Sequence, residues 1–239
     1  DFKKRNYSYN MESIKINSNE IVLLGTSHIS PKSVKDINNF VQKNNPDIIC
    51  IELDKNRAIG LFQKGKRKYP LSLIKRIGFS GYVFALIGSY IEKKIASKIG
   101  TKVGDDMKAG ILSANKHKIP VAFIDQNIEI TLRRFSKLFT FKQKLKLFWF
   151  IIKSFFTKQE KIAFDITGVP EQDQIDKIIE MLKPNVPVFY NVLIEERNVF
   201  MVNKILRICK KEQDKLILCI IGAGHKKGMA ELLKKYNKN

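Results

Sequence analysis

The same short pattern occurs near both ends of the chain: a strongly apolar run, the tetrapeptide Gly-x-x-His, and then a predicted helix. In the first copy the apolar run covers residues 21–25 and the histidine is His28. In the second copy the run covers residues 215–222 and the histidine is His225. Runs of Val, Ile and Leu that end in Gly are typical of buried strands. In open α/β sheets, ligands bind at the carboxyl ends of the strands. The pattern therefore predicts that both histidines meet at one edge of a parallel sheet.

Two further apolar runs, at residues 47–52 and 120–125, predict two more strands. A helical pattern that begins at Pro31 and stops at Pro46 separates the first two strands, and this is the order of a β-α-β unit. We therefore predict an α/β fold with a central, mostly parallel or mixed sheet and flanking helices. Other segments with helical spacing cover residues 62–102, 104–117, 131–157, 170–182, 188–209 and 228–236.

Charge is concentrated in the middle of the chain. Against 23 Asp and Glu, the 239 residues include 44 Lys and Arg, which gives a formal net charge of +21, and residues 61–164 hold 22 basic and 6 acidic groups. A hydrophobic fraction of 44% excludes a disordered polycation. The basic middle predicts either a surface for an anionic membrane or acidic partner, or only a lysine-rich composition. Zinc-finger, RRM and helix-turn-helix signatures are missing, so we expect no nucleic-acid partner.

These segments predict a single α/β domain over residues 1–239. The core is expected at about residues 20–62, 103–126 and 165–239, and the basic helical cap at about residues 63–102 and 127–164. Aromatic and aliphatic residues at helical spacing between 145 and 156 are expected to face a core, with a lid or membrane-surface helix as the alternative.

Cysteine use and the terminal sequence bear on the compartment. Cys50, Cys209 and Cys219 contain no C-x-x-C pair, which favours a reducing compartment over disulfides or a thiolate zinc site. The first residues lack the apolar stretch of a signal peptide, and the uncharged stretch at residues 77–91 is too short to span a bilayer. We expect a cytoplasmic protein, with a membrane anchor outside this chain as the alternative.

Histidine side chains at the sheet edge would suit metal chemistry. Neutral imidazole is a common ligand of divalent ions near pH 7, and it also titrates close enough to neutrality to move protons. Glu52, at the end of the second strand, would add an oxygen ligand or act as a base toward a bound water, so the expected reaction is hydrolysis. The alternative is that both histidines only fix loop geometry through hydrogen bonds. His117, between two lysines, is expected at the surface.

Glu52 ends an apolar strand, where a buried charge is costly without a partner. An arginine partner would make either a structural ion pair or a clamp for a substrate carboxylate or carbonyl. Glu195 and Glu196 are adjacent on a predicted helix and point about 100° apart, so only one is expected to face a site. The remaining charged candidates are Arg57, Asp105, Asp106, Asp125, Arg133 and Arg197.

Taken in order, these motifs resemble the TraB/PrgY family. The resemblance covers about residues 21 to 233, and it is specific as an ordered set although each motif alone is weak. It is carried by Gly25-Thr-Ser-His28, Pro46 to Asp54 with Arg57, Gly104 to Met107, Ile124-Asp125 with Thr131-Leu-Arg133, Glu196-Arg197 with Met201, and Gly222-Ala-Gly-His225.

The family is similar to the Tiki proteases and, more distantly, to the erythromycin esterase and ChaN groups. The resemblance implies an α/β core of two related halves, each supplying a Gly-x-x-His loop, with helical additions over the site. It implies metal-dependent peptide hydrolysis, with manganese or cobalt favoured and zinc as a further candidate. TraB/PrgY members are also linked to shutdown of peptide pheromone signalling, and archaeal members often carry a membrane-spanning tail.

Carried over residue by residue, the resemblance implies that His28, His225 and Glu52 are metal or catalytic groups. Arg57, Glu196 and Arg197 would support the site. Two positions depart from the family pattern: Asn198 stands where an acidic residue is common, and Gln126 stands where Arg is common.

The sequence therefore predicts a metal-dependent hydrolase, with peptides or proteins as the expected substrates. In this prediction His28 and His225 ligate the ion, Glu52 is a third ligand or a base, and Arg197 or Arg57 stabilises the developing oxyanion. The alternative is a non-catalytic protein of the TraB/PrgY type that sequesters a peptide or acts at a membrane. A homodimer would allow two subunits to share the helical additions.

Overall fold

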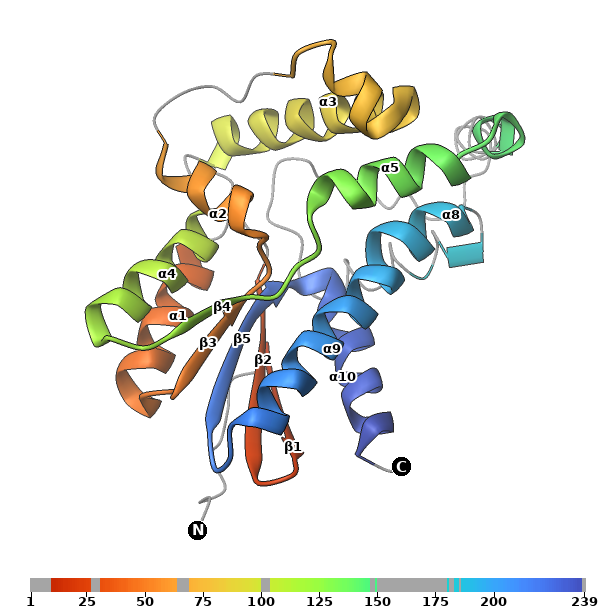
Figure 1. Cartoon of the computed structure of the whole chain (residues 1–239). Helices are drawn as coiled ribbons and strands as arrows, with labels where there is room; N and C mark the ends of the chain where they lie inside the picture. Colours follow the sequence, from red (N-terminus) through yellow and green to blue (C-terminus); the bar gives the residue numbers. More distant parts are fainter. Residues whose placement is uncertain are drawn as a thin grey trace, which may run out of the picture.

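A computed structural model describes residues 10–26, 31–63, 69–99, 104–146, 149, 180, 183–184 and 186–237. Its centre is a five-stranded sheet in the order β1-β2-β5-β3-β4 (Figure 1). The strands are β1 (Met11–Ile16), β2 (Asn19–Thr26), β3 (Ile48–Ile51), β4 (Val121–Phe123) and β5 (Leu216–Gly222). Only the β1 pairing with β2 is antiparallel, and the other three pairings are parallel. The predicted α/β fold with a mixed sheet is confirmed.

Strands β2 and β5 form the middle of the sheet. Every residue of both strands is buried, which is why their sequences read as nearly continuous apolar runs. Strand β1 was not predicted from the sequence. It lies at the edge of the sheet, where charged residues such as Glu12 and Lys15 alternate with apolar ones, and this pattern is weaker than that of a strand buried on both faces.

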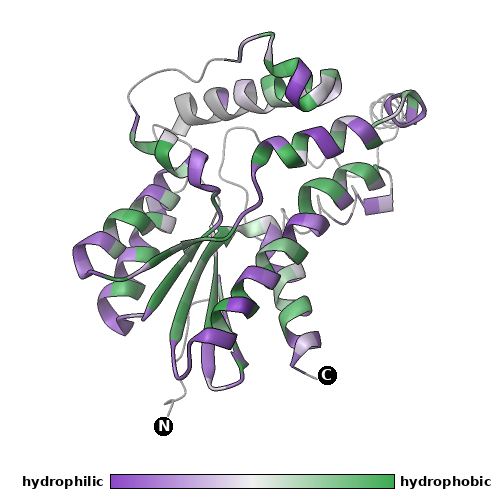
Figure 2. Cartoon of the chain, in the orientation of Figure 1, coloured by the Kyte–Doolittle hydropathy of each residue, from purple (hydrophilic) through white to green (hydrophobic). Residues whose placement is uncertain are grey.

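Helices cover both faces of the sheet (Figure 1). On one face, α1 (Pro31–Asn44) and α4 (Asp105–His117) pack through Ile37, Phe40 and Met107 against Val22 and other sheet residues. On the opposite face, α9 (Glu196–Lys211) and α10 (Ala223–Tyr236) pack through Met201, Ile205, Met229 and Leu233. Figure 2 shows the strands as hydrophobic and the helices as mixed, as expected for three layers with amphipathic outer helices.

A third group of helices lies beyond the carboxyl ends of the parallel strands. Helix α3 (Leu73–Ile99) bends at Gly78, whose φ is +75°, and packs on α5 (Ile128–Leu138) through Ile77, Tyr82 and Leu132. A short helix, α2 (Lys55–Phe62), leads toward this layer, and Asp54 caps it by accepting hydrogen bonds from the backbone N–H groups of residues 56 and 57. Phe84, Phe135 and Phe189 make aromatic contacts inside the layer.

The last third of the chain differs from the sequence prediction in two places. The helix expected from residue 188 is divided into α8 (Pro187–Tyr190), a π-helical turn η1 (Asn191–Glu195) and α9. Helix α10 begins at Ala223 rather than at Gly228, so His225 lies in the first helical turn and not in a loop. Gly222 takes an extended conformation at the N-cap, which turns the chain directly from β5 into the helix.

Some predictions fall on residues whose placement is not described. His28, the helix expected at residues 170–182 and most of the aromatic segment after residue 146 lie outside the described residues. Trp149 is described and is 60% exposed. The described helices include none with the length and hydropathy that a bilayer crossing requires. The division into core and cap segments stays a prediction.

Candidate functional site

The candidate site lies where the parallel strands end. Thr26 at the end of β2 pairs with Gly222 at the end of β5, so the segment that carries His28 and the helix that carries His225 start from neighbouring strand ends. Glu52 directly follows β3 at the same edge. The sheet order thus joins residues from the beginning, the first quarter and the end of the chain, as expected at the carboxyl edge of a parallel sheet.

Glu52 is almost completely buried, with 3% of its surface exposed. Its Oε2 accepts a hydrogen bond of 2.5 Å from the backbone N–H of Gly222. Its Oε1 accepts a hydrogen bond of 2.5 Å from Nη2 of Arg197 and lies 3.3 Å from Nε2 of His225. The buried carboxylate therefore has both a cationic partner and a backbone donor, which offset the cost of removing it from water.

Arg197, on the first turn of α9, connects the ends of two strands. Its Nε donates to Oδ1 of Asp125 at 3.0 Å, its Nη2 donates to Oδ2 of Asp125 at 2.8 Å, and its Nη1 donates to the carbonyl of Leu193 at 3.1 Å. Burial alone would lower the pKa of Arg197, but the charges of Glu52 and Asp125 outweigh that effect and raise it above its ordinary value. Arg197 therefore stays cationic and holds both carboxylates in place.

Arg57, on α2, is the second cation at this cluster. Its Nη1 lies 2.9 Å from Oδ2 of Asp125, and 28% of its side chain is exposed, compared with 12% for Arg197. Asp125 itself has no exposed side-chain surface. The cluster therefore contains two carboxylates and two guanidinium groups, and Arg57 is the more exposed of the two arginines.

His225 is oriented by a buried amide. Its Nδ1 lies 2.7 Å from Oδ1 of Asn198, and both residues are buried. In the neutral tautomer whose Nδ1–H donates to Asn198, Nε2 carries the ring lone pair and lies on the side of Glu52. A hydrogen bond at one ring nitrogen commonly fixes which nitrogen of a histidine is available to a metal ion.

Asp106 is a further buried acid near the same strand ends. Its Oδ2 lies 2.5 Å from the hydroxyl of Thr26, which is also 3.2 Å from the carbonyl oxygen of Ile221. This contact ties the first turn of α4 to the end of β2 and to β5. Asp105, the neighbouring candidate, lies in the same helical turn.

Other sequence candidates lie away from Arg197. Glu196 pairs with Arg134 at 2.5 Å on a partly exposed face, and Glu195 accepts a hydrogen bond from the hydroxyl of Tyr190 at 3.1 Å. Arg133 donates to the carbonyl of residue 76. His117 is exposed at the end of α4. The described structure therefore brings together Glu52, Arg57, Asp125, Arg197 and His225, and it places Glu196 outside this group.

A family model for the TraB/PrgY/gumN family matches residues 10–239. The chain belongs to this family. Within the TraB/PrgY/gumN family, it is 32% identical over 222 residues to an uncharacterized protein of Methanocaldococcus jannaschii, covering 92% of this chain and 55% of the relative.

More distant relatives of this TraB/PrgY/gumN chain occur in mammals. TraB domain-containing proteins of Mus musculus and Homo sapiens are 19% and 18% identical to it, and each alignment covers 87% of this chain and 61% of the relative. The chain thus spans between 55% and 61% of the length of these three relatives. The family membership predicted from the ordered motifs is confirmed.

The described residues supply two of the ligands that a metal centre would need. Within the described residues, no group of three or more His, Cys, Asp or Glu side chains is arranged to hold a metal ion. Nε2 of His225 and Oε1 of Glu52 are nevertheless two potential ligand atoms 3.3 Å apart. Two ligands of one ion, each about 2.0–2.2 Å from it, lie about 3–3.5 Å apart. A third ligand would have to come from outside the described residues.

Sequence reasoning did not assign a role to Asn198 beyond noting its departure from the family pattern. In the structure, its amide oxygen lies 2.7 Å from Nδ1 of His225. Gln126, the other departure, bonds to Thr131 through its side chain at 3.0 Å and to Asp125 through its backbone N–H at 2.7 Å. The signal available in the sequence was the position of Asn198 directly after Arg197.

Proposed function

We propose that this chain is a metal-dependent hydrolase, with peptides as its substrate class, in which His225, Glu52 and His28 hold the ion. The observation that carries the proposal is the pair formed by His225 Nε2 and Glu52 Oε1, which are buried and 3.3 Å apart. In the neutral tautomer whose Nδ1–H donates to Asn198, the lone pair on Nε2 faces the anionic oxygen of Glu52. A cation between the two atoms relieves that repulsion.

His28 is the expected third ligand. It follows Thr26 by two residues, and Thr26 pairs with Gly222, three residues before His225. Manganese or cobalt is favoured by the family resemblance, with zinc as a further candidate. An ion held at this site would activate a water molecule and polarise a carbonyl group.

The residues around Glu52 have separate tasks in this proposal. Arg197 uses four of its five N–H donors on Glu52, Asp125 and Leu193, so its main task is to orient the two carboxylates. The guanidinium of Arg57 has one described hydrogen bond, to Asp125, and 28% of the Arg57 side chain is exposed. Arg57 is therefore the better donor to an oxyanion that develops on a cleaved carbonyl.

Metal titration tests the proposal. Isothermal titration with manganese, cobalt and zinc should give stoichiometric binding to the wild type, and His225→Ala and His28→Ala should each weaken it at least about tenfold. His117→Ala is the matched control, because His117 is exposed at the far end of α4. A fluorogenic peptide library should be cleaved by the wild type and the control only. Equal ion affinity in all three variants would exclude a histidine metal site and leave the non-catalytic alternative.

A further inference from the structure

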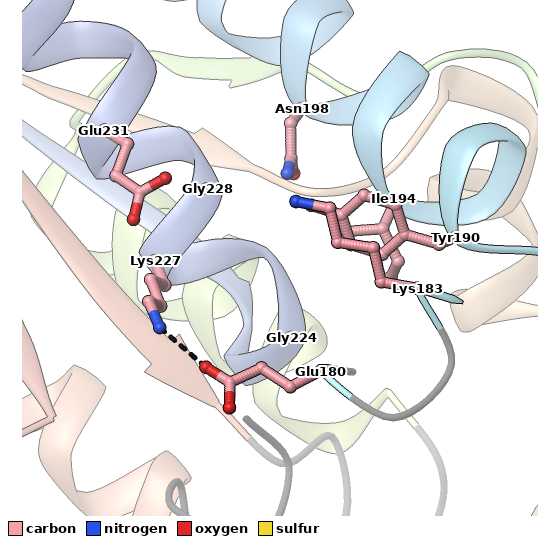
Figure 3. Close-up of a pocket in the computed structure, with 9 residues that line it drawn as sticks. All are labelled: Glu180, Lys183, Tyr190, Ile194, Asn198, Gly224, Lys227, Gly228 and Glu231. Atoms are coloured by element: carbon pink, nitrogen blue, oxygen red, sulfur yellow. Dashed lines mark hydrogen bonds and ion pairs between the residues drawn. The ribbon is translucent and has the colours of Figure 1, made fainter. Parts of the chain in front are cut away.

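A small pocket is lined by residues of η1, α9 and the first three turns of α10 (Figure 3). One of its lining residues, Asn198, is the hydrogen-bond partner of His225. Its volume is about 190 Å³, which is room for about six water molecules. The pocket is therefore of the size that suits an amino acid or a very short peptide. The polar side chains that matter for the inference are Lys183, Tyr190, Asn198, Lys227 and Glu231.

Asn198 gives this pocket a buried hydrogen-bond donor. The residue has no exposed surface, its Oδ1 is bonded to His225, and its Nδ2 has no hydrogen-bond partner among the described residues. A Cβ at position 228 would collide with Nδ2, so Gly228 is the residue that leaves room for the amide at the pocket wall. An unsatisfied buried donor costs about 1–3 kcal/mol, and a ligand that accepts its hydrogen bond would remove this cost.

The charged groups of the pocket divide into a satisfied pair and two groups without an ion pair. Lys227 and Glu180 pair with each other at 3.0 Å. Lys183 lies over the ring of Tyr190, 5.0 Å from its centroid, and neither Lys183 nor Glu231 forms an ion pair within the described part of the chain. Figure 3 shows the ammonium of Lys183 and the amide of Asn198 pointing into the same space, with Glu231 on the facing helix α10.

Glu231 also lies close enough to Tyr190 to affect it. Burial raises the pKa of Tyr190 to about 12, with further contributions from the hydrogen bond to Glu195 and from the charges of Glu195 and Glu231. The phenol therefore stays neutral, and its hydroxyl already donates to Glu195. The remaining recognition groups of the pocket are one cation, one buried amide N–H and one carboxylate.

We propose that this pocket binds a free dipeptide or amino acid through its two charged ends. The ligand carboxylate accepts hydrogen bonds from Asn198 Nδ2 and Lys183 Nζ, and the ligand ammonium pairs with Glu231. This site goes beyond the metal-dependent hydrolase because it requires no ion. Since Asn198 bonds to His225 through its other amide atom, a ligand that holds the amide also fixes the orientation of the imidazole.

Calorimetric titration of the metal-free protein, in the presence of a chelator, tests the site with glycylglycine and two blocked forms. N-acetylglycylglycine lacks the ammonium, and glycylglycine amide lacks the carboxylate. The wild type should bind glycylglycine at least about tenfold more tightly than either blocked form, because each blocked form loses one charge-assisted contact.

Two substitutions should give opposite patterns. Lys183→Met should lower the affinity for glycylglycine and for N-acetylglycylglycine about tenfold, and it should leave the affinity for glycylglycine amide unchanged. Glu231→Gln should lower the affinity for glycylglycine and for glycylglycine amide, and it should leave the affinity for N-acetylglycylglycine unchanged. Lys210→Met, an exposed lysine at the other end of α9, is the control.

The proposal is overturned if the wild type binds none of the three peptides, or if both variants bind glycylglycine as the wild type does. Because the titration is done without metal, its result is independent of whether His225 holds an ion. If the wild type binds glycylglycine but no metal ion, the hydrolase proposal fails and the peptide pocket stands. If it binds a metal ion but no glycylglycine, the peptide pocket fails and the hydrolase proposal stands.

Discussion

Arg197 shows how much of the site depends on one side chain. Its guanidinium forms ion pairs with Glu52 and Asp125, which follow the ends of different strands. Its Nη1 also donates a hydrogen bond to the carbonyl oxygen of Leu193. All three charged groups are nearly buried. Removing one member of such a group leaves the others charged and without compensation, which costs more than the group contributes as a whole.

Asp125→Ala should therefore lower the free energy of unfolding by about 3–5 kcal/mol, because it leaves Arg197 and Arg57 without their shared carboxylate. Urea unfolding followed by circular dichroism measures the change. Lys234→Met is the matched control, since the Lys234 pair with Glu12 is exposed and should be worth less than about 1 kcal/mol. A loss for Asp125→Ala no larger than that of the control would mean that the cluster does not stabilise the fold.

Single residues were partly predictable from the sequence. Because Glu52 ends an apolar run, the sequence predicted a charged partner for it, and in the structure that partner is Arg197. The position of Asn198 between His225 and a pocket depends on how α9 packs beside α10, and no local pattern carries that information. The pair that Glu196 forms with Arg134 depends on the position of α5 relative to α9, and the sequence does not show this either.

Among the secondary-structure elements, the four strands of the parallel part of the sheet were predicted within about two residues. Burial on both faces makes β2 and β5 almost continuously apolar, and β3 and β4 are shorter apolar runs, of which β4 is only half-buried. The edge strand β1 was missed because charged residues interrupt its pattern. The π-helical turn η1 and the early start of α10 were also missed. Both depend on tertiary contacts and on backbone geometry at Gly222, which helical periodicity does not encode.

Two glycines in different helices should respond oppositely to the same substitution. A Cβ at Gly110 in α4 would lie 2.5 Å from Cδ1 of Ile220 and 3.3 Å from Cδ1 of Ile51, so Gly110→Ala should push α4 from the sheet and cost about 1–3 kcal/mol. A Cβ at Gly60 in α2 meets nothing within 4 Å, so Gly60→Ala should stabilise by about 0.5–1 kcal/mol. Chemical denaturation of the two variants measures the change in the free energy of unfolding. If both substitutions change it in the same direction, the described packing of α4 is contradicted.

Across the whole molecule, the ordered motifs predicted both the family and the α/β class, because each motif sits at the end of a strand or at the start of a helix that the fold requires. What they could not predict is the common core of the three thiols. Cys50 on β3, Cys209 on α9 and Cys219 on β5 lie on three different elements but belong to one buried apolar cluster. Burial, together with the charge of Cys50, raises the pKa of Cys209 to about 11.

This shift predicts a loss of stability in alkali. The folded protein keeps Cys209 neutral up to about pH 11, whereas the unfolded thiol ionises near pH 9. The stabilisation is therefore complete below pH 9 and is lost as the pH rises toward 11, by about 1–2 kcal/mol for this thiol. Urea unfolding across this range should show a smaller decline for Cys209→Ala than for the wild type. Parallel declines would assign the effect to other groups.

The position of β5 between β2 and β3 has a consequence for synthesis on the ribosome. The strand at the centre of the sheet comes from the last part of this chain, after both of its neighbours and most of the helices. Until residues 216–222 have emerged, β2 and β3 have no partner on the sides where β5 will join them. Such exposed apolar edges invite aggregation, so a nascent chain of this design depends on rapid completion or on chaperones that shield the waiting strands.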